Sequence, residues 1–467
     1  MERIPEHKLR PRLEPTKRAV ELLGDPQHAY RVIHVTGTNG KTSTTRIIER
    51  ILREHGLRTG RFTSPHLVRF NERIAIDGMP VSDERLYSVW QDIKPILEIV
   101  DAELIADGDT KLTFFEALAV LGFAIFADAP VDVLVLEVGM GGTWDSTNVA
   151  DGDVAVFTPI DFDHMDRLGD TIDEIASTKA GIIKPNALVV SSAQPQEATD
   201  VLRARAEQIG DGWVQFGENF GVLRAETEGF GQRFSVQGLA AVYNDLYLPL
   251  LGPYQVHNAA VAIAAVEAFL GGGQQPINHH ILLSALADAT SPGRLQIVSR
   301  EPFVLLDAAH NPQGAAALSQ TLHGIRLASQ TIGVVSILGD KDAVGILRGL
   351  SDCFDEIVVT ASTSPRALSP EQLADLAAEI FGEERVQLAA TPVAALALAR
   401  ELVTDPRAGA IVVTGSITLV GDVLKLQQSQ DVDDDYDEGQ DEDEAESDLY
   451  EAQESVEMEA PEDDPED

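Results

Sequence analysis

The residues best suited to chemistry lie in one short stretch, residues 32–44, with the sequence VIHVTGTNGKTST. Its two glycines let backbone N–H groups turn toward a bound anion, and its lysine supplies a full positive charge. The hydroxyl groups that follow the lysine are suitable ligands for Mg²⁺. The stretch therefore predicts a loop that binds the phosphates of a nucleoside triphosphate, made of Gly37, Thr38, Asn39, Gly40, Lys41, Thr42 and Ser43.

This predicted loop differs from the common eight-residue phosphate-binding loop. The common form has a glycine where this chain has Val35, and here only two residues separate Gly37 from Gly40. The alternative interpretation is a plain turn from a strand to a helix, in which Lys41 has no part in binding.

A second polar group follows two predicted strands. Glu137 ends one strand and precedes the run GMGG, whereas Asp161, Asp163 and His164 follow the next strand. Ligands of parallel α/β sheets bind at the carboxyl edge, where these side chains would emerge. A buried carboxylate needs a partner, and a cation is a suitable one. We therefore expect Mg²⁺ near Glu137. The alternative for Glu137 is an acid that caps a helix, and the alternative for His164 is an ordinary loop histidine.

Two further segments carry cations. Residues 63–66 (TSPH) precede residues 69–73 (RFNER), an extended polar segment in which Arg73 is a candidate to bind a carboxylate substrate. Lys179 lies in a run of small and apolar residues. Two metal ions would repel it as an ammonium, whereas its carbamate would be an anionic ligand.

Strands and helices alternate around these residues. Residues 31–36, 132–138 and 153–158 are nearly continuous apolar runs that predict strands buried on both faces, and residues 42–55 predict a helix after the loop. Together they indicate a parallel sheet with crossover helices.

The rest of the chain predicts a second α/β unit. Residues 187–250 give little helix signal and three short strands, at 188–190, 233–236 and 246–250. An alanine-rich helix at 258–270 stops at three glycines, and a boundary is expected near residue 292. Beyond it, the prediction is strands at 304–307, 332–338, 356–360 and 410–414 with helices such as 370–381 and 392–403.

The predicted fold is therefore α/β: a domain with a mostly parallel sheet of the P-loop type, then a smaller Rossmann-like domain. The expected ranges are 1–292 for the nucleotide-binding domain with the substrate site, 293–426 for the domain that closes on it, and 427–467 for a disordered acidic tail.

Composition excludes several classes of protein. The net charge is −41, and the tail holds 21 of the 76 acidic residues and no basic one, so we expect no binding to nucleic acid through a basic face. The longest apolar run, residues 117–127, is shorter than the ~20 residues that span a bilayer. The single cysteine, Cys353, rules out a disulfide framework. We expect a monomeric, cytoplasmic protein without membrane partners.

Ten strings in this order resemble the dihydrofolate synthase/folylpolyglutamate synthase family of the Mur ligase superfamily. They cover roughly residues 10–426 and are HVTGTNGKTST, TSPHLVRFNERI, LTFFEA, LEVGMGGTWDSTN, DHMDRLGDTIDEIASTKAGIIKP, QVHNAAVA, PGRLQ, LLDAAHNPQG, LGDKD and VTGSITLVGDV.

The resemblance implies a role for each matching position. Lys41, Glu137, His164 and Lys179 would serve catalysis. Magnesium, as one or two ions, would be held by Ser64, Glu137, His164, carbamylated Lys179 and Thr42, and a monovalent cation is a further candidate cofactor. ATP would also contact Asn258, Arg294, Asp307 and His310, with Asn311 close by. The pterin site would be lined by Thr113, Phe114, Phe115, Glu116, Trp144, Asp145 and Ser146.

The chain departs from the family pattern at three places. Thr42 replaces the usual glycine after the lysine, as in the muramyl-peptide ligases. Thr143 and Trp144 stand where the family often has Arg-Leu before the aspartate, and Thr178 replaces the commoner Glu before Lys179.

The implied reaction joins the carboxylate of a dihydropteroate or folate to the amine of L-glutamate, with ATP converting the carboxylate to an acyl phosphate. A muramyl-peptide ligase is the alternative suggested by Thr42, although the strings FFEA and DHMDRLG oppose it. From another class, the chain could be a nucleotide-hydrolysing switch with an acidic docking tail. A pseudoenzyme is disfavoured because Lys41, Glu137, His164 and Lys179 are all present.

Overall fold

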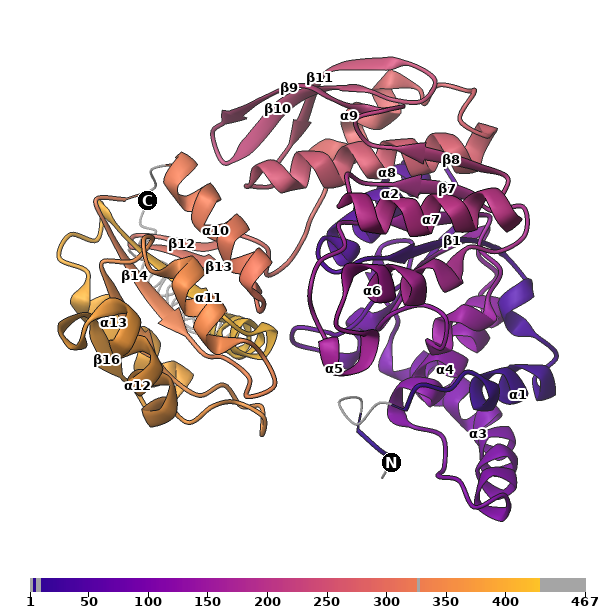
Figure 1. Ribbon diagram of the computed structural model, residues 1–467, viewed down its shortest axis with the longest axis horizontal. Coiled ribbons are helices and arrows are strands. Elements are labelled where there is room, and N and C mark those ends of the chain that lie inside the picture. Colours follow the sequence, from indigo (N-terminus) through magenta and orange to yellow (C-terminus); the bar gives the residue numbers. More distant parts are fainter. Residues whose placement is uncertain (1–2, 6–9, 326–327, 429–467) are drawn as a thin grey trace, which may run out of the picture.

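The computed structural model describes residues 3–5, 10–325 and 328–428. The predicted disorder of the acidic tail concerns residues that lie almost wholly outside these ranges. The described part has two lobes, with the earlier part of the chain in one and the later part in the other (Figure 1). The prediction of two successive α/β units is confirmed.

An eight-stranded sheet forms the centre of the first lobe. Its strands are β1 (Arg31–Thr36), β2 (Thr59–Phe62), β3 (Ile74–Ile76), β4 (Met79–Pro80), β5 (Val133–Glu137), β6 (Val154–Phe157), β7 (Leu188–Ser191) and β8 (Gly212–Gln215). The spatial order is β4-β3-β2-β5-β1-β6-β7-β8. The six strands β2, β5, β1, β6, β7 and β8 pair in parallel, each with its neighbour in this order. Strands β3 and β4 add an antiparallel edge beside β2. Strand β1 lies in the middle, so the loop that follows it emerges at the centre of the carboxyl edge.

Helices cover both faces of this sheet. They are α1 (Glu14–Leu22), α2 (Lys41–Glu54), α3 (Asp83–Ala106), α4 (Phe114–Asp128), α5 (Met165–Leu168), α6 (Ile172–Lys179), α7 (Gln196–Ile209), α8 (Pro253–Gly271) and α9 (His279–Ala287). Alternate residues of β1 point to opposite faces: Ile33 and Val35 join the apolar cluster with α2 and α8, whereas Val32 joins the cluster with α3 and α4. Short 3₁₀ turns include η2 (Phe70–Arg73), η3 (Ser146–Val149) and η4 (Ala180–Ile182).

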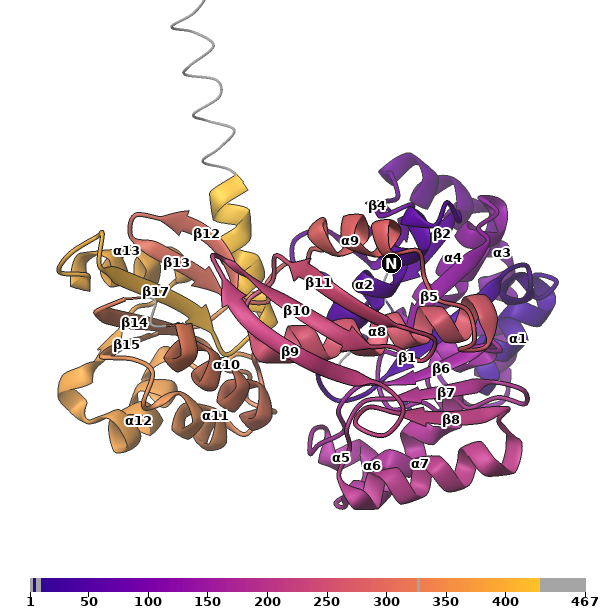
Figure 2. The same ribbon diagram turned by 90° about the horizontal axis from the view of Figure 1, so that it is seen from above.

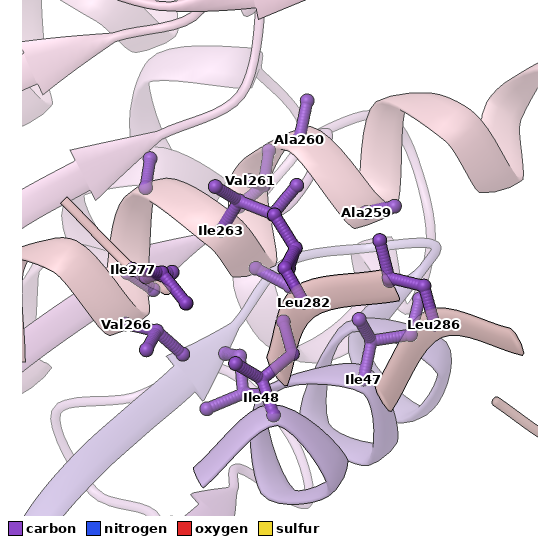
Figure 3. Close-up of a cluster of buried hydrophobic side chains, with 14 of the residues drawn as sticks. Ile47, Ile48, Ala259, Ala260, Val261, Ile263, Val266, Ile277, Leu282 and Leu286 are labelled. Carbon is purple, nitrogen blue, oxygen red and sulfur yellow. The ribbon is translucent and has the colours of Figure 1, made fainter. Parts of the chain in front are cut away.

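Helix α2 is held firmly because one of its faces is apolar. Ile47 and Ile48 pack in a buried cluster with side chains of α8 and α9, among them Ile263 and Leu282 (Figure 3). Burying such side chains contributes roughly 1.5–3 kcal/mol each. The packing fixes the axis of α2 and therefore the position of its first residue, Lys41.

A three-stranded antiparallel sheet lies beside α8. Its strands are β9 (Gly221–Glu228), β10 (Gly231–Gln237) and β11 (Val242–Leu248). The prediction that residues 187–250 contain little helix is wrong for α7. The buried face of α7 is narrow, with Ala198, Leu202 and Ala206 in one row, so its apolar period is weak in the sequence.

The second lobe is built on a six-stranded sheet. Its strands are β12 (Gln296–Arg300), β13 (Phe303–Leu306), β14 (Gln330–Val335), β15 (Glu356–Val359), β16 (Val386–Leu388) and β17 (Gly409–Thr414), in the order β12-β13-β17-β14-β15-β16. Only the β12–β13 pair is antiparallel within this sheet as described. The helices are α10 (Pro312–Ile325), α11 (Ala343–Leu350), α12 (Pro370–Phe381), α13 (Pro392–Leu402) and a last helix over residues 417–428. The predicted boundary at residue 292 falls between α9 and β12.

The lobes also meet away from the sheet edges. The hairpin of β9 and β10 reaches toward β12 and β13 (Figure 2). There the ring centroids of Phe230 and Phe303 lie 5.6 Å apart, and Arg300 stacks over Phe230. Among the described residues, no helix is both long enough and apolar enough to cross a membrane.

Candidate active site

One pocket of about 600 Å³ lies at the carboxyl edge of the first sheet and is closed by the second lobe. The first lobe contributes the phosphate loop (residues 37–43), Ser64, the strand end at Glu137, and Lys179. The second lobe contributes, among other side chains, Arg294, Asp307, His310, Lys341 and Arg366. The pocket thus combines residues that are more than 300 positions apart in the sequence.

Glycine is required at two places in the phosphate loop. Gly37 has φ +152°, and a Cβ there would lie 1.9 Å from the Thr158 hydroxyl oxygen. Gly40 has φ +86°, and a Cβ there would lie 2.7 Å from Oδ1 of Asn258. Both positions need a backbone conformation that favours glycine as well as the missing side chain. The loop therefore passes directly over β6 and beside α8.

Two lysines converge on one carbonyl of this loop. The Nζ atoms of Lys41 and Lys179 donate to the Gly37 oxygen at 3.0 and 2.9 Å, and Lys41 also donates to the Thr38 oxygen. Burial lowers the pKa of both amines, and for Lys179 burial together with the proximity of Lys41 lowers it to about 7. Two buried amines side by side are a favourable environment for an anion, because an anion would offset both desolvation and mutual repulsion.

Glu137 has one carboxylate oxygen without a partner. Its Oε1 accepts a hydrogen bond from the Thr42 hydroxyl at 2.9 Å, whereas Oε2 is buried and has no hydrogen-bond partner. Burial raises the pKa of Glu137 to about 7, although Lys41 opposes the shift. The hydroxyls of Thr42 and Ser64 line the same pocket. These oxygen donors fit Mg²⁺, which keeps several waters and usually binds one or two carboxylates together with phosphate oxygens.

Asp163 joins the two lobes at the pocket wall. Its carboxylate lies 2.6 Å from the Lys341 ammonium and accepts a hydrogen bond from Asn311 at 3.3 Å. Burial alone would raise the pKa of Asp163, but the nearby His164 and Lys341 hold it below its usual range. The side chains of Asn39 and Asn311 also exchange hydrogen bonds, at 3.1 and 3.3 Å.

Family models and relatives agree with this architecture. Residues 35–266 match the Mur ligase middle domain, and residues 293–417 match the Mur ligase, glutamate ligase domain. The chain is 43% identical to the dihydrofolate synthase/folylpolyglutamate synthase of Mycobacterium tuberculosis, covering 90% of this chain and 91% of the relative. It is 36% identical to the Bacillus subtilis protein of the same name, over 79% and 85%. The chain belongs to the dihydrofolate synthase/folylpolyglutamate synthase family.

Solved structures of the synthase family share the fold. The structure of Mycobacterium tuberculosis folylpolyglutamate synthase with ADP and AMPPCP has a TM-score of 0.86 and 43% identity, and the match covers 90% of this chain and 96% of that one. A complex of a folylpolyglutamate synthase with AMPPCP and folate has a TM-score of 0.76 and 34% identity, with 90% and 94% covered. The sequence-based assignment to the family is therefore confirmed.

Most of the site residues predicted for the synthase family lie in the pocket. All positions assigned to phosphate, ATP, metal or catalysis line it: Gly37, Thr38, Asn39, Gly40, Lys41, Thr42, Ser43, Ser64, Glu137, His164, Lys179, Asn258, Arg294, Asp307 and His310. His164 lies beside Asp163, at 3.8 Å, and not in a cluster of acidic or histidine ligands with Glu137. Within the described ranges there is no group of three or more His, Cys, Asp or Glu side chains that could hold a metal.

The residues predicted to bind the pterin lie outside this pocket's lining. Thr113 and Glu116 form the capping box that begins α4, and Glu116 also pairs with Arg12. Phe114 lies under the Arg73 guanidinium, whose Nε donates to His66 at 2.8 Å. Trp144 packs on the cluster around α6, and the Ser146 hydroxyl accepts from Thr16.

Two of these residues, Phe115 and Asp145, nevertheless lie next to a residue of the pocket lining, Gly139. A Cβ on Gly139 would lie 2.4 Å from the Phe115 ring and 3.1 Å from a carboxylate oxygen of Asp145. Gly139 itself lines the pocket. Phe115 and Asp145 therefore meet at the wall next to Glu137, while the role of all seven residues in binding substrate stays a prediction.

Several residues of the pocket have no role in the sequence-based prediction. Lys341, in the string LGDKD, is one of them, and Tyr254, Ser416 and Arg366 are others. Their signal was weak because each lies on a separate element of the second lobe or at its border, with no spacing that links it to the phosphate loop.

Proposed function

We propose that the protein ligates L-glutamate to dihydropteroate and to folates, with ATP as the energy source. The observation that carries this proposal is the shared pocket, in which the phosphate loop and Glu137 of the first lobe face charged residues of the second. The family supports the reaction class, and two related structures hold ADP, AMPPCP or folate.

The phosphate loop and Lys41 would bind the β- and γ-phosphates of ATP. Backbone N–H groups at the start of α2 and the Lys41 ammonium offset the negative charge that spreads over the transferring phosphoryl group. The acceptor carboxylate attacks the γ-phosphorus, which gives an acyl phosphate and ADP. Mg²⁺, held by Glu137 with Thr42 and Ser64, would supply charge neutralisation at the phosphates when it is bound.

The amine of glutamate then attacks the acyl carbon, and phosphate leaves. The acyl phosphate hydrolyses if water reaches it, which explains why two lobes close over the pocket. Burial lowers the pKa of His164 and His310 to about 4, so both rings are neutral at pH 7, and either would accept the proton that the amine loses once an anionic substrate beside it raises its pKa. The choice between them is open to mutagenesis.

The carbamylation of Lys179 belongs to the same proposal. Its pKa of about 7 leaves much of the amine neutral, which is the form that reacts with CO₂. The carbamate would present oxygens for a second Mg²⁺ in place of a buried ammonium. Incubation with ¹³C-labelled bicarbonate should give a carbamate signal by ¹³C NMR that Lys179→Met abolishes.

The decisive experiment is product analysis with labelled glutamate. The enzyme is incubated with ATP, Mg²⁺ and a panel of acceptors that includes dihydropteroate, folates and a muramyl peptide, and products are identified by mass. Transfer of ¹⁸O from the acceptor carboxylate into released phosphate tests the acyl phosphate. ADP release without glutamate or acceptor would instead favour a nucleotide-hydrolysing switch, and a product only from the muramyl peptide would favour that ligase class.

A further inference from the structure

His34 is a buried histidine on the central strand that the proposed reaction does not use. It lies on β1, three residues before Gly37, and has no solvent exposure. Its Nε2 lies 2.9 Å from the Thr147 hydroxyl oxygen, and its Nδ1 has no hydrogen-bond partner. Burial lowers the pKa of His34 to about 3, with a smaller effect from Lys184, so the ring is neutral. A neutral ring carries one proton, and its position depends on Thr147.

Thr147 lies between His34 and Asp145. Its hydroxyl is 2.5 Å from Oδ1 of Asp145, and the same carboxylate accepts the backbone N–H groups of Thr147 and Met140, both at 2.9 Å. Burial raises the pKa of Asp145, whereas these donors lower it and favour an ionised carboxylate, which can only accept. The single hydroxyl proton of Thr147 therefore goes to Asp145. Thr147 can then only accept from His34, so the imidazole proton must be on Nε2.

The last hydrogen bond of this series, from Met140 to Asp145, supports the wall of the pocket. The Met140 N–H that binds Asp145 belongs to the glycine loop (residues 139–142), which follows Glu137. The Gly141 carbonyl of the same loop accepts from the Thr36 hydroxyl at 2.8 Å, so β1 holds the loop at two points. Residues 139–141 line the pocket. A buried network of this kind restricts its members to one geometry when every donor is matched.

We propose that His34 and Thr147 are positioning residues for the ligase: His34 donates to Thr147, Thr147 donates to Asp145, and this His34 relay holds the glycine loop in the pocket wall beside Glu137, where Phe115 and Asp145 of the predicted pterin site meet. The proposal rests on the proposed function. The relay touches neither the phosphate loop's N–H groups nor Lys41, so it should affect the acceptor and the chemical step more than the binding of nucleotide.

The first test measures the tautomer directly and needs no activity. In protein with ¹⁵N-labelled histidine, a long-range ¹H–¹⁵N spectrum separates the protonated ring nitrogen from the unprotonated one, and loss of one signal set in His34→Gln assigns His34 among the 11 histidines. We expect a neutral ring with the proton on Nε2 at pH 7. A proton on Nδ1, or a charged ring, would overturn the relay.

The second test compares variants that keep or remove each donor. Gln places an amide N–H near the position of Nε2, whereas Leu does not; Ser keeps the hydroxyl of Thr147, whereas Val removes it. We expect His34→Leu and Thr147→Val to lower kcat/KM for the acceptor about tenfold or more, which corresponds to about 1.4 kcal/mol. His34→Gln and Thr147→Ser should recover most of it. The Kd for ADP should stay within about twofold in all four.

Three outcomes separate the possibilities. If the wild-type enzyme ligates no acceptor, the proposed function fails, while the tautomer measurement still decides the relay. If the wild type ligates and Leu and Gln variants have equal kcat/KM, the positioning role is wrong. If Kd for ADP and kcat/KM fall together in proportion to thermal stability, His34 acts on folding alone and the positioning role is likewise wrong.

Discussion

At the scale of single residues, Glu137 is needed for the proposed reaction but lowers the stability of the free enzyme. Glu137 keeps a buried carboxylate oxygen without a hydrogen bond, which costs stability in the free enzyme. We expect Glu137→Gln and Lys41→Met each to reduce ADP formation at least about 100-fold. Glu137→Gln should leave the Tm unchanged or raise it, because it removes a desolvated charge. Calorimetry and a coupled ADP assay on the same preparations check both parts.

His34 also predicts how stability depends on pH. Its pKa is about 3 in the folded chain against about 6.5 in an unfolded one, so below pH 6.5 the unfolded state binds the extra proton. Stability from this group is therefore complete above pH 6.5 and falls as pH decreases toward 3, by about 2 kcal/mol between pH 7 and 5. Urea unfolding at both pH values should show this difference shrinking in His34→Gln. Exposed His280, replaced in the same way, is the control and should show no such change.

The phosphate-binding half of the site could be predicted from sequence because its residues are consecutive. Gly37 to Ser43 form one loop, and local geometry decides both conformation and chemistry. Lys341 could not be found in this way, since its role depends on meeting Asp163 across the pocket, a contact that only the packing of two lobes creates. Likewise, the capping of α4 by Thr113 and Glu116 is local, but their distance from the pocket depends on tertiary structure.

At the scale of elements, the segment before α1 is tied to the start of α4. Arg12 makes a two-point ion pair with Glu116, at 2.8 and 3.0 Å, and the Glu116 side chain is only 4% exposed. Removing Arg12 alone leaves this buried carboxylate without its cation. We expect Arg12→Met to cost about 3–5 kcal/mol of unfolding free energy.

A double variant distinguishes loss of the ion pair from loss of packing. Glu116→Gln keeps the capping box, because Gln can also accept the N–H of Thr113. Combined with Arg12→Met, it should recover most of the lost stability in urea unfolding. A double variant as unstable as Arg12→Met would mean that the Arg12 stem, and not its charge, holds the segment.

The elements of the fold differ in how clearly the sequence encodes them. Strand β1 was predicted to the residue because its apolar run is buried on both faces, and α12 because Ser369 caps it and Pro370 begins it. Helix α7 was missed since it buries only a narrow row of side chains, whereas β9 was missed because most of its residues are exposed. Elements with little burial leave little pattern.

At the scale of the whole molecule, the loop of residues 64–69 is a further contact between the lobes. The Glu72 carboxylate binds the N–H groups of Leu67, Val68 and Arg69 and so makes their loop rigid. Leu67 packs on the second lobe, where a Cβ on Gly421 would lie 2.1 Å from its carbonyl oxygen. The same loop carries Ser64 into the pocket.

We therefore expect Gly421→Ala to displace the loop or separate the lobes, and to lower kcat at least about tenfold. Gly324 on α10 is the matched control, because a Cβ there meets nothing within 4 Å. Alanine at that position should leave kcat unchanged and add up to about 1 kcal/mol of helix stability. Equal kcat in the two variants would show that the lobes adjust freely.

The pocket walls belong to two bodies, and this has a consequence for the speed of turnover. If ADP binds between the phosphate loop and the second lobe, we expect its release to require Lys341 to part from Asp163 and Asn39 from Asn311. Opening of the two lobes displaces solvent, so its rate depends on the viscosity of the medium. In sucrose or glycerol, kcat should decline in step with relative viscosity, while a polymer that thickens the bulk without crowding the protein surface should leave it unchanged.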